Sequence, residues 1–528
     1  MRSRIMIAAL TAAVLGAVLA GCGPAPSERT YYVSSTGSDS ASGTSPGSAW
    51  RTIAKVNAAN LEPGDRVLFR GGASYPGSLY LSPDDGGTAA EPVTLSSYEG
   101  TATIAAGGGT GIYAYRVGGI TVSDLSVVGA GRTANAGSGI AFYNDLTGDV
   151  LLGGIRISDV STSGFRDYGV SLGGGAGRSG YRDVRIEQLR TFDNGASGLL
   201  TFAAAHAVHQ NVYVGRSEAF RNTGRPEVTF NTGSGIVLGS VAGATIEHNY
   251  AHDNGGLNQF REGPVGIWTY DATRVVIQFN RSYANNTGVV VDGGGFNLDQ
   301  NVTASTMQYN HSRGNDGPGF LLAQRWATTA HSGNTVRYNI SEDDARKGSG
   351  AGILVWGAVR NAKILHNTVF LGSGTSSGVR AVRVSNPGRE TSDTASVHVR
   401  NNLFFTRAGV PLVEATATQL DGSTDLRFEG NDWYGEGGTT FVWGSTSYSS
   451  LSGWRSGTGQ ERVGSTAVGL SVNPQLVAAG TGTEGSKLQS GSPLVDAGLD
   501  VASAGARDYF GNAAPRGVAP DVGAHELR

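Results

Sequence analysis

The stretch DGGGFNLDQ, residues 292–300, places three glycines between two acids, a pattern that could form a phosphate cradle, a cation-binding loop or a tight corner in a repeating structure. A dinucleotide-binding loop needs a strand, a glycine-rich turn and then a helix. Here the residues that follow the glycines alternate as in a strand, with no helical pattern. The glycines are therefore predicted to form a corner that opens a strand, which leaves Asp292 and Asp299 as the candidates for chemistry.

The acids lie within a repeat that is marked by one asparagine. Each copy of this asparagine follows a segment of alternating hydrophobic residues, and the copies recur about every 30 residues at Asn249, Asn280, Asn310, Asn339, Asn367, Asn402 and Asn431. A steady period of this length is typical of a solenoid of stacked units. Asparagine tolerates turn conformations and its amide can bond to copies of itself. We therefore expect the seven asparagines to form an internal ladder.

A second short strand opens with glycine in each unit, at residues 235–239, 266–270, 295–299, 319–323 and 352–356. Several short strands per unit, with Gly, Asn and Asp between them, predict a chain that turns three corners and stacks on the coil below. The 82 glycines in 528 residues fit such a chain, because it needs many turns. The predicted fold is an all-β parallel β-helix.

Both ends of the chain resemble a known superfamily. The segment from Tyr31 to Gly72 and the closing segment from Ser492 to Glu526 are similar to those of right-handed parallel β-helix proteins of the pectin-lyase-like superfamily. The resemblance covers roughly residues 30–528 and implies a helix at about residues 52–59 that caps the open end of the stack, and a C-terminal closing segment. It does not define the activity, since this fold includes lyases, hydrolases, epimerases and non-catalytic proteins.

In that superfamily the substrate groove usually runs along the sheet whose strand follows the turn after the asparagine ladder, which here is the glycine-opened strand. Alternation along this strand directs Trp268, Tyr270, Asn297, Asp299 and Trp356 outward. Aromatic rings beside acids and amides suit a sugar site, because the rings stack on sugar faces and the polar groups bind hydroxyls. Alternatively, the aromatic residues pack under a long loop as a small hydrophobic cluster separate from the main core, called here a satellite cluster.

Asp299 is the predicted catalytic carboxylate, with Asp271 or Asp292 as its partner. Carboxylates on adjacent coils lie about 5 Å apart when directly stacked, which permits a general acid and base pair with one raised pKa. The same oxygens could instead hold Ca²⁺, through Asp292 and Asp299. A third reading is that acids at stacked corners, such as Asp316, are only turn residues.

Long connections in the central coils add charged residues, including Glu262 as a substrate-binding candidate and Arg325 just beyond the groove strand. The resemblance implies that in a lyase Arg325 would neutralise a uronate carboxylate or act as a base beside Ca²⁺. We expect a polysaccharide-active enzyme, either a glycoside hydrolase or a polysaccharide lyase. The alternative is a non-catalytic surface protein that binds glycans or mediates adhesion.

The N-terminus carries Arg2 and Arg4 before an apolar run that is too short for a permanent membrane span, which predicts a signal peptide over residues 1–21. The sequence Leu19-Ala20-Gly21-Cys22 resembles the bacterial lipobox, and Cys22 is the only cysteine. We therefore expect Cys22 to be lipidated and the protein to lie outside the cytoplasm as a cell-surface lipoprotein, with full secretion as the alternative. A short linker, 22–30, would then precede one domain, 31–528, with a cap region (31–105), regular coils (106–435) and a closing region (436–528).

The charge balance limits the partners. With 40 basic and 43 acidic side chains, the chain lacks the basic excess of nucleic-acid-binding proteins. We expect no nucleic-acid partner, membrane contact only through the lipid anchor, a polysaccharide as substrate, and a monomer.

Overall fold

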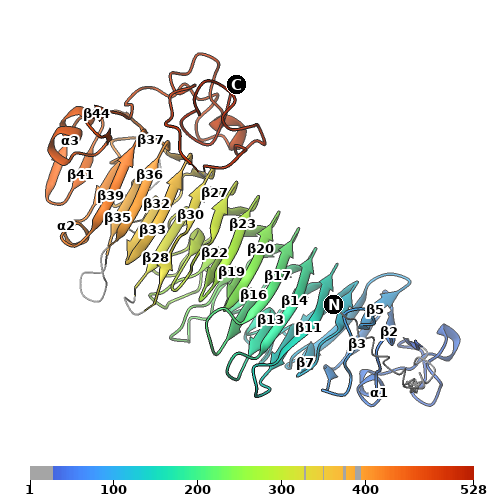
Figure 1. Ribbon diagram of the computed structural model, residues 1–528. Coiled ribbons are helices and arrows are strands. Elements are labelled where there is room, and N and C mark those ends of the chain that lie inside the picture. Colours follow the sequence, from blue (N-terminus) through green and yellow to red (C-terminus); the bar gives the residue numbers. More distant parts are fainter. Residues whose placement is uncertain are drawn as a thin grey trace, which may run out of the picture.

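A computed structural model describes residues 28–325, 329–348, 350–372, 376–386, 394–502 and 504–527. The chain winds into a long stack of coils, and the strands of successive coils pair in parallel to form three sheets that run the length of the molecule (Figure 1). The predicted fold class, a right-handed parallel β-helix, is confirmed. The signal peptide and Cys22 lie outside the described residues.

The first strand of each coil belongs to a 15-stranded sheet. Its members are β1 (Thr30–Val33), β2 (Arg66–Arg70), β5 (Val93–Tyr98), β8 (Ile120–Ser123), β11 (Leu151–Ser158), β14 (Gly180–Glu187), β17 (His209–Gly215), β20 (Val241–Glu247), β23 (Thr273–Gln278), β26 (Thr306–Gln308), β29 (His331–Ser332), β30 (Thr335–Arg337), β33 (Val359–Leu365), β36 (Ala395–Arg400) and β39 (Thr424–Glu429).

The second strand of each coil belongs to a 13-stranded sheet. Its members are β3 (Ser74–Pro76), β6 (Ala102–Gly107), β9 (Leu125–Gly129), β12 (Ser161–Ser163), β15 (Arg190–Phe192), β18 (Glu218–Phe220), β21 (Tyr250–His252), β24 (Arg281–Tyr283), β27 (His311–Arg313), β31 (Ile340–Glu342), β34 (Thr368–Leu371), β37 (Leu403–Arg407) and β40 (Asp432–Glu436).

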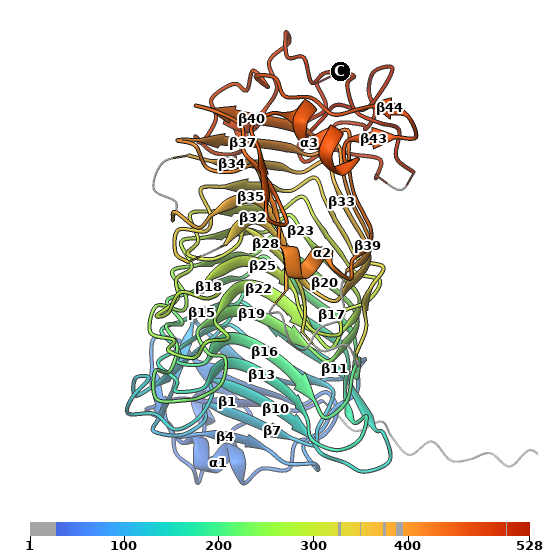
Figure 2. The same ribbon diagram turned by 90° about the vertical axis from the view of Figure 1, so that its left-hand side faces the viewer.

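The third strand of each coil belongs to a 14-stranded sheet, here called the groove sheet, which faces the viewer in Figure 2. Its members are β4 (Leu79–Leu81), β7 (Ile112–Tyr115), β10 (Ile140–Asn144), β13 (Tyr168–Gly174), β16 (Ser197–Ala203), β19 (Ser234–Gly239), β22 (Val265–Tyr270), β25 (Gly294–Leu298), β28 (Phe320–Gln324), β32 (Ala351–Gly357), β35 (Arg380–Ser385), β38 (Val413–Ala415), β41 (Phe441–Trp443) and β42 (Thr446–Tyr448). A separate hairpin joins β43 (Arg462–Val463) to β44 (Thr466–Ala467).

Helices occur at the ends of the stack. Helix α1 (Ile53–Asn57) begins at Thr52, whose hydroxyl accepts the Lys55 N–H at 3.2 Å, and it buries Ile53 and Val56 over the first coils. This is the helical cap that the resemblance predicted. Helices α2 (Ala417–Leu420) and α3 (Leu451–Thr458) lie near the other end, and 3₁₀ turns cover Pro46–Ser48 and Thr483–Ser486. Within the described ranges, no helix has the length and apolar character that a membrane crossing requires.

The interior of the coils is apolar and is crossed by a ladder of amides. The seven predicted asparagines are buried, and the Nδ2 of each of the first six donates to the Oδ1 of the next copy, for example from Asn249 to Asn280 at 2.9 Å and from Asn310 to Asn339 at 3.0 Å. The last, Asn431, donates to Oε1 of Glu461 at 2.8 Å. Each Nδ2 also donates to a backbone carbonyl of the preceding coil, as Asn310 does to Ile277 at 2.8 Å. The ladder prediction is confirmed.

A second ladder runs beside the first and was not predicted. The side chains of Asn194, Asn222, Asn254, Asn285 and Asn315 are buried and donate in turn at 2.9–3.0 Å, and Asn315 donates to Asp344 at 2.8 Å. Burial raises the pKa of the Asp344 carboxyl to about 6. This ladder fixes the corner that leads into the groove sheet.

The C-terminal segment folds back over the outside of the 13-stranded sheet. Leu476, Leu488, Leu494 and Val522 pack on Phe370, Leu403 and Phe405, which point outward from β34 and β37. Asn401 ties this segment down, because its Nδ2 donates to the Leu499 carbonyl at 2.7 Å. The closing segment thus leaves the groove sheet open.

Candidate functional site

Alternation along the groove sheet places side chains as predicted. The eight residues expected to point inward are fully buried: Ile267, Thr269, Phe296, Leu298, Phe320, Leu322, Ile353 and Val355. The outward residues form a column across the coils, because Trp268 pairs with Asn297, Asn297 with Leu321, Leu321 with Leu354, and Leu354 with Arg383. Successive members lie about 4.8 Å apart along the stack.

A second outward column runs beside the first. Asp299 follows β25 and donates its backbone N–H to the Thr269 carbonyl at 2.9 Å, which places it next to Tyr270. Ala323 and Trp356 are register partners, as are Trp356 and Ser385. The small Ala323 side chain leaves space between Asp299 and the Trp356 ring.

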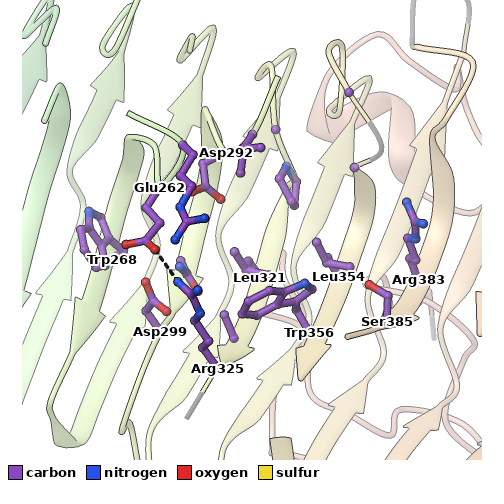
Figure 3. A pocket seen from close by; sticks show the side chains of 18 of the residues that line it. Glu262, Trp268, Asp292, Asp299, Leu321, Arg325, Leu354, Trp356, Arg383 and Ser385 are labelled. Carbon is purple, nitrogen blue, oxygen red and sulfur yellow. Dashed lines mark hydrogen bonds and ion pairs between the residues drawn. The ribbon is translucent and has the colours of Figure 1, made fainter. Parts of the chain in front are cut away.

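The two columns form the floor of a cavity of about 810 Å³ (Figure 3). Eight of the predicted site residues line it: Glu262, Trp268, Tyr270, Asp292, Asn297, Asp299, Arg325 and Trp356. They come from four consecutive coils. The stacking therefore brings together residues as far apart in the sequence as Glu262 and Trp356, which are 94 positions apart.

Asp299 is the most strongly perturbed carboxylate in this cavity. Its Oδ1 accepts the Gln300 N–H at 2.8 Å. Burial, with smaller contributions from the nearby charges of Asp292 and, more weakly, Glu262, raises the pKa of the Asp299 carboxyl to about 7. Near neutral pH, Asp299 is therefore partly protonated and able to donate a proton.

Asp292 lies in the corner before β25, with a left-handed φ of +56°. Its Oδ2 accepts the Gly263 N–H at 2.7 Å, and burial raises the pKa of its carboxyl to about 6, with a smaller contribution from Glu262. The adjacent Gly293 also has a positive φ, +75°, and a Cβ on Gly295 would lie 2.2 Å from the Ser312 hydroxyl. The glycines of this stretch serve the corner and the packing, as predicted, with β25 starting at Gly294.

An ion pair lies beside Asp299. Arg325, which follows β28, places Nη1 2.7 Å from Oε1 of Glu262, which belongs to the connection before β22. Figure 3 shows the pair next to Asp299, with Trp268 on one side and Leu321 and Trp356 on the other. Arg325 thus brings a positive charge close to the carboxylates.

Trp268, Tyr270 and Asn297 form one end of the cavity. Trp268 is 8% exposed, packs on Val237 and Val265, and donates from Nε1 to the Ser234 hydroxyl at 3.1 Å. The Tyr270 ring lies over Gly239, where a Cβ would be 2.2 Å from its Cζ. Trp268 therefore combines the two roles weighed from sequence, since it belongs to a satellite cluster and still borders the cavity.

Asn297 carries an unsatisfied acceptor. The residue is 3% exposed, and its buried Oδ1 receives no hydrogen bond from the described residues. A buried amide oxygen without a donor is costly, and such groups in native structures are usually satisfied by a ligand or water. The position of Asn297 on the cavity floor makes a ligand hydroxyl or N–H a suitable donor.

Asp271, the other partner predicted for Asp299, does not line the cavity. It adopts a left-handed φ of +48°, and its Oδ1 accepts the Asn301 Nδ2 at 3.0 Å on the turn outside the groove. Asp316 is likewise a corner residue: its Oδ2 lies 2.8 Å from the Lys347 Nζ and accepts the Thr287 N–H at 3.0 Å. Asp292 is therefore the carboxylate that the fold brings to Asp299.

The donor set does not fit the Ca²⁺ site considered from sequence. Asp292 and Asp299 each accept a backbone N–H, and Arg261 and Arg325 line the same cavity. Ca²⁺ takes six to eight oxygens, usually with several carboxylates. In the ranges that the structure describes, no group of three or more His, Cys, Asp or Glu side chains is arranged to hold a metal.

The far end of the cavity was not predicted from the sequence. Arg383, Ser385, Asn386 and Thr416 line it there, and Arg383 Nη2 lies 3.5 Å from Oε1 of Glu414. The strand β35 that carries Arg383 and Ser385 begins with Arg380, so it lacks the opening glycine that marked the other groove strands. The alternation of Arg383 and Ser385 with buried valines was the signal that could have revealed them.

Comparisons with known proteins agree with this architecture. Residues 206–369 match a family model described as a right-handed beta helix region. The fold is similar to that of the GH136 lacto-N-biosidase from Eubacterium ramulus, at 16% identity and a TM-score of 0.51, covering 70% of this chain and 68% of that one. It is also similar to XylC in complex with xylose, at 10% identity and a TM-score of 0.50, covering 94% and 98% of the two chains. No curated protein matches the sequence.

Proposed function

We propose that this right-handed parallel β-helix protein of pectin-lyase-like type hydrolyses glycosidic bonds of a polysaccharide bound in the cavity of the groove sheet. The observation that carries the proposal is the pair Asp299 and Asp292, whose environments give their carboxyls pKa values of about 7 and about 6. Two carboxylates with separated, raised pKa values beside a sugar-sized cavity suit acid and base roles.

Asp299 would act as the general acid. Its proton goes to the glycosidic oxygen as the bond from that oxygen to the anomeric carbon breaks. Asp292, which ionises at lower pH, would act as the base that takes a proton from the attacking water, and the resulting hydroxide bonds to the anomeric carbon. One water is consumed, two sugar hydroxyl ends are formed, and no further reactant is needed.

The rest of the cavity would hold the sugar units. Trp356 and Trp268 offer ring surface, Asn297 an acceptor, and Arg325 a positive charge beside the carboxylates. The lacto-N-biosidase and the xylose complex of XylC, with which the chain shares its fold, are carbohydrate-related by name, which is in keeping with a glycan ligand.

The test is a screen for cleavage over neutral and acidic polysaccharides, followed by variants on any polymer that is cut. Asp299→Asn keeps the shape and removes the proton donor, so turnover should fall by about 10²–10⁴ while binding is retained. Asp271→Asn, an equal change outside the cavity, should keep turnover within about twofold of the parent protein, because surface changes away from a site have small effects. Full turnover by Asp299→Asn would remove Asp299 from the mechanism.

A lyase is the second candidate, because four cationic side chains line the cavity: Arg261, Arg325, Lys347 and Arg383. Such charges would neutralise uronate carboxylates, as a lyase requires. The product separates the two activities, since a lyase leaves an unsaturated sugar that absorbs ultraviolet light and a hydrolase does not. Binding of a polymer with no cleavage would instead favour a non-catalytic glycan-binding surface protein.

We also propose that the protein acts outside the cytoplasm, held by a lipid on Cys22. Multiple acyl chains on one residue anchor a protein firmly, whereas an unacylated chain has no such hold. Cys22→Ser should therefore move the protein from the membrane fraction to the medium, as measured by immunoblotting of both fractions. A variant that stays with the membranes would contradict the lipoprotein assignment.

A further inference from the structure

The cavity extends unequally on the two sides of Asp299. Along the groove sheet its lining begins on β22, with Trp268 and Tyr270, and continues over β25, β28, β32 and β35 to Thr416. Asp299 follows β25, so one strand lies on one side of it and three strands lie on the other. With about 4.8 Å between coils, the short side has room for about one sugar ring.

The short side ends in a covered surface. Val237 on β19 is the register partner of Trp268 one coil earlier and also points outward, yet it is only 1% exposed. It packs with Trp268 and Val265 in a small apolar cluster. A glycan chain lying along the sheet therefore meets this cluster instead of continuing over β19.

Two long connections build the wall around this end. Residues 222–233 precede β19 and residues 253–264 precede β22, and they bond to each other through Leu257 N–H to the Thr223 carbonyl at 2.7 Å and Asn231 Nδ2 to the Gly263 carbonyl at 2.7 Å. The Gly263 N–H in turn donates to Asp292. The wall is thus held by hydrogen bonds from a backbone and a side-chain donor to backbone carbonyls, and it also bonds to one of the two carboxylates.

The far side is built differently. Beyond Asp299 the floor passes over Ala323 to Leu354 and Trp356, which are partly exposed, and then to Arg383 and Ser385 (Figure 3). These residues offer apolar ring surface first and polar groups further on. This order of apolar and then polar surface suits several consecutive sugar units of one glycan chain.

We propose that the cavity receives the end of a glycan chain, with the terminal unit against Trp268, Tyr270 and Asn297 and the following units over Trp356 toward Arg383. The inference rests on the proposed function, and it specifies that function as removal of units from chain ends rather than cleavage within the chain. The unsatisfied Oδ1 of Asn297 selects a terminal unit that places a hydroxyl or N–H donor on it.

The first test determines which glycosidic bond of a linear oligosaccharide is cleaved first. The probes are linear hexasaccharides of xylose, mannose, glucose, galactose and galacturonate, with mass spectrometry of the products below one tenth conversion. Release of a terminal unit together with the shortened chain is the expected result. Early products from the middle of the chain would overturn the end-binding inference and leave the proposed hydrolase intact.

The second test needs no turnover. Asp299→Asn is titrated with long and short fractions of one polymer at equal mass, for each polymer of the same panel. Binding that follows the number of chain ends supports the inference even if nothing is cleaved, an outcome that contradicts only the hydrolase. Binding that follows total mass overturns the inference. If no probe is bound or cut, the cavity is not a glycan site and both proposals fail.

A pair of variants maps the two sides. In the Asp299→Asn background, Asn297→Ala should weaken binding of di- and hexasaccharides alike, because every chain places its terminal unit there. Trp356→Ala should weaken binding of the hexasaccharide about tenfold and spare the disaccharide, since only longer chains reach the ring. Equal losses at both lengths for Trp356→Ala would contradict the proposed direction of binding.

Discussion

At the scale of single residues, the candidate site depends on carboxylates that the fold removes from water. Asp292 and Asp299 are separated by only a corner and one short strand, but the corner's left-handed backbone turns Asp292 toward the same cavity. Burial then raises the pKa of each carboxyl, and their mutual repulsion keeps one proton in the pair near neutral pH.

This pair predicts a narrow pH optimum. Activity should fall as pH rises above about 7, where Asp299 loses its proton, and fall below about 6, where Asp292 gains one. The negative charge of Glu262 raises the pKa of both carboxyls. Glu262→Gln removes this charge, while the positive charge of Arg325 still favours the ionised carboxylates. Both limbs of the pH profile of kcat/KM should therefore move to lower pH.

The control for this shift is Glu99→Gln, which removes an exposed glutamate paired with Arg70 at 3.0 Å far from the cavity. Its pH profile should coincide with that of the parent protein. A profile for Glu262→Gln that is unmoved, or displaced to higher pH, would contradict the electrostatic account of the site.

At the scale of elements, the ladders hold strained corners in register. The residue before each asparagine of the first ladder has a left-handed φ, as in Phe279 (+56°) and Tyr309 (+57°), which is unfavourable for bulky side chains. The amide that follows compensates by closing the turn. Asn310 accepts from the N–H and the Nδ2 of Asn280 and donates to Ile277 and Asn339.

Asn310→Ala should therefore destabilise the protein by about 3 kcal/mol, because it leaves several buried donors and acceptors unsatisfied. Urea unfolding at pH 6 would measure the change. The matched control, Asn286→Ala, removes a partly exposed corner amide whose one side-chain hydrogen bond among the described residues goes to the Ala284 carbonyl at 2.8 Å, and it should cost less than about 1 kcal/mol. Similar losses in both variants would show that the ladder has no special role.

Elements were the level at which the sequence was most informative. Alternation after each opening glycine predicted which residues face the core, because a strand inside a coil has one buried face and one exposed face. The second ladder was missed although Asn254, Asn285 and Asn315 each follow a first-ladder asparagine by five residues. This spacing was not recognised as a second repeat, and asparagine is common in turns for local reasons as well.

Contacts between distant segments were beyond such reasoning. The pairing of Glu262 with Arg325 depends on how two long connections bend, and alternation does not define that path. The exclusion of Asp271 had the same cause, because the direction of a side chain at a left-handed corner is not given by strand alternation. The closing segment docks through contacts such as Asn401 with Leu499, which no repeat period indicates.

At the scale of the whole molecule, buried ionisable groups set the pH range of stability. His209, His331 and His366 are buried, and burial lowers their pKa to about 4. The unfolded chain binds their protons more readily, so stability falls as pH drops from about 6.5 to about 4. Buried carboxyls act in the opposite direction, because burial raises their pKa and the folded state then binds the proton more tightly.

Asp432 is the clearest of these carboxyls. It is fully buried in β40, its Oδ1 accepts the Val472 N–H at 3.1 Å, and its Oδ2 has no partner among the described residues. Burial raises the pKa of this carboxyl from an ordinary value of 3.8 to about 8. The folded state therefore binds the proton more tightly, and the stability contributed by the neutral form is lost as pH rises from about 4 through about 8.

Asp432→Asn should remove this loss, because the amide stays neutral and still offers an oxygen to Val472. Relative to the parent protein, the free energy of unfolding of the variant should rise by roughly 4 kcal/mol between pH 5 and pH 8, because over this range the unfolded parent is ionised while its folded carboxyl keeps the proton. Urea titrations from pH 4 to pH 9 would measure both curves. The histidine-dependent loss of stability below about pH 6.5 should be the same in both proteins. A variant that is equally destabilised at pH 5 and pH 8 would show that Asp432 acts through packing and not through its charge.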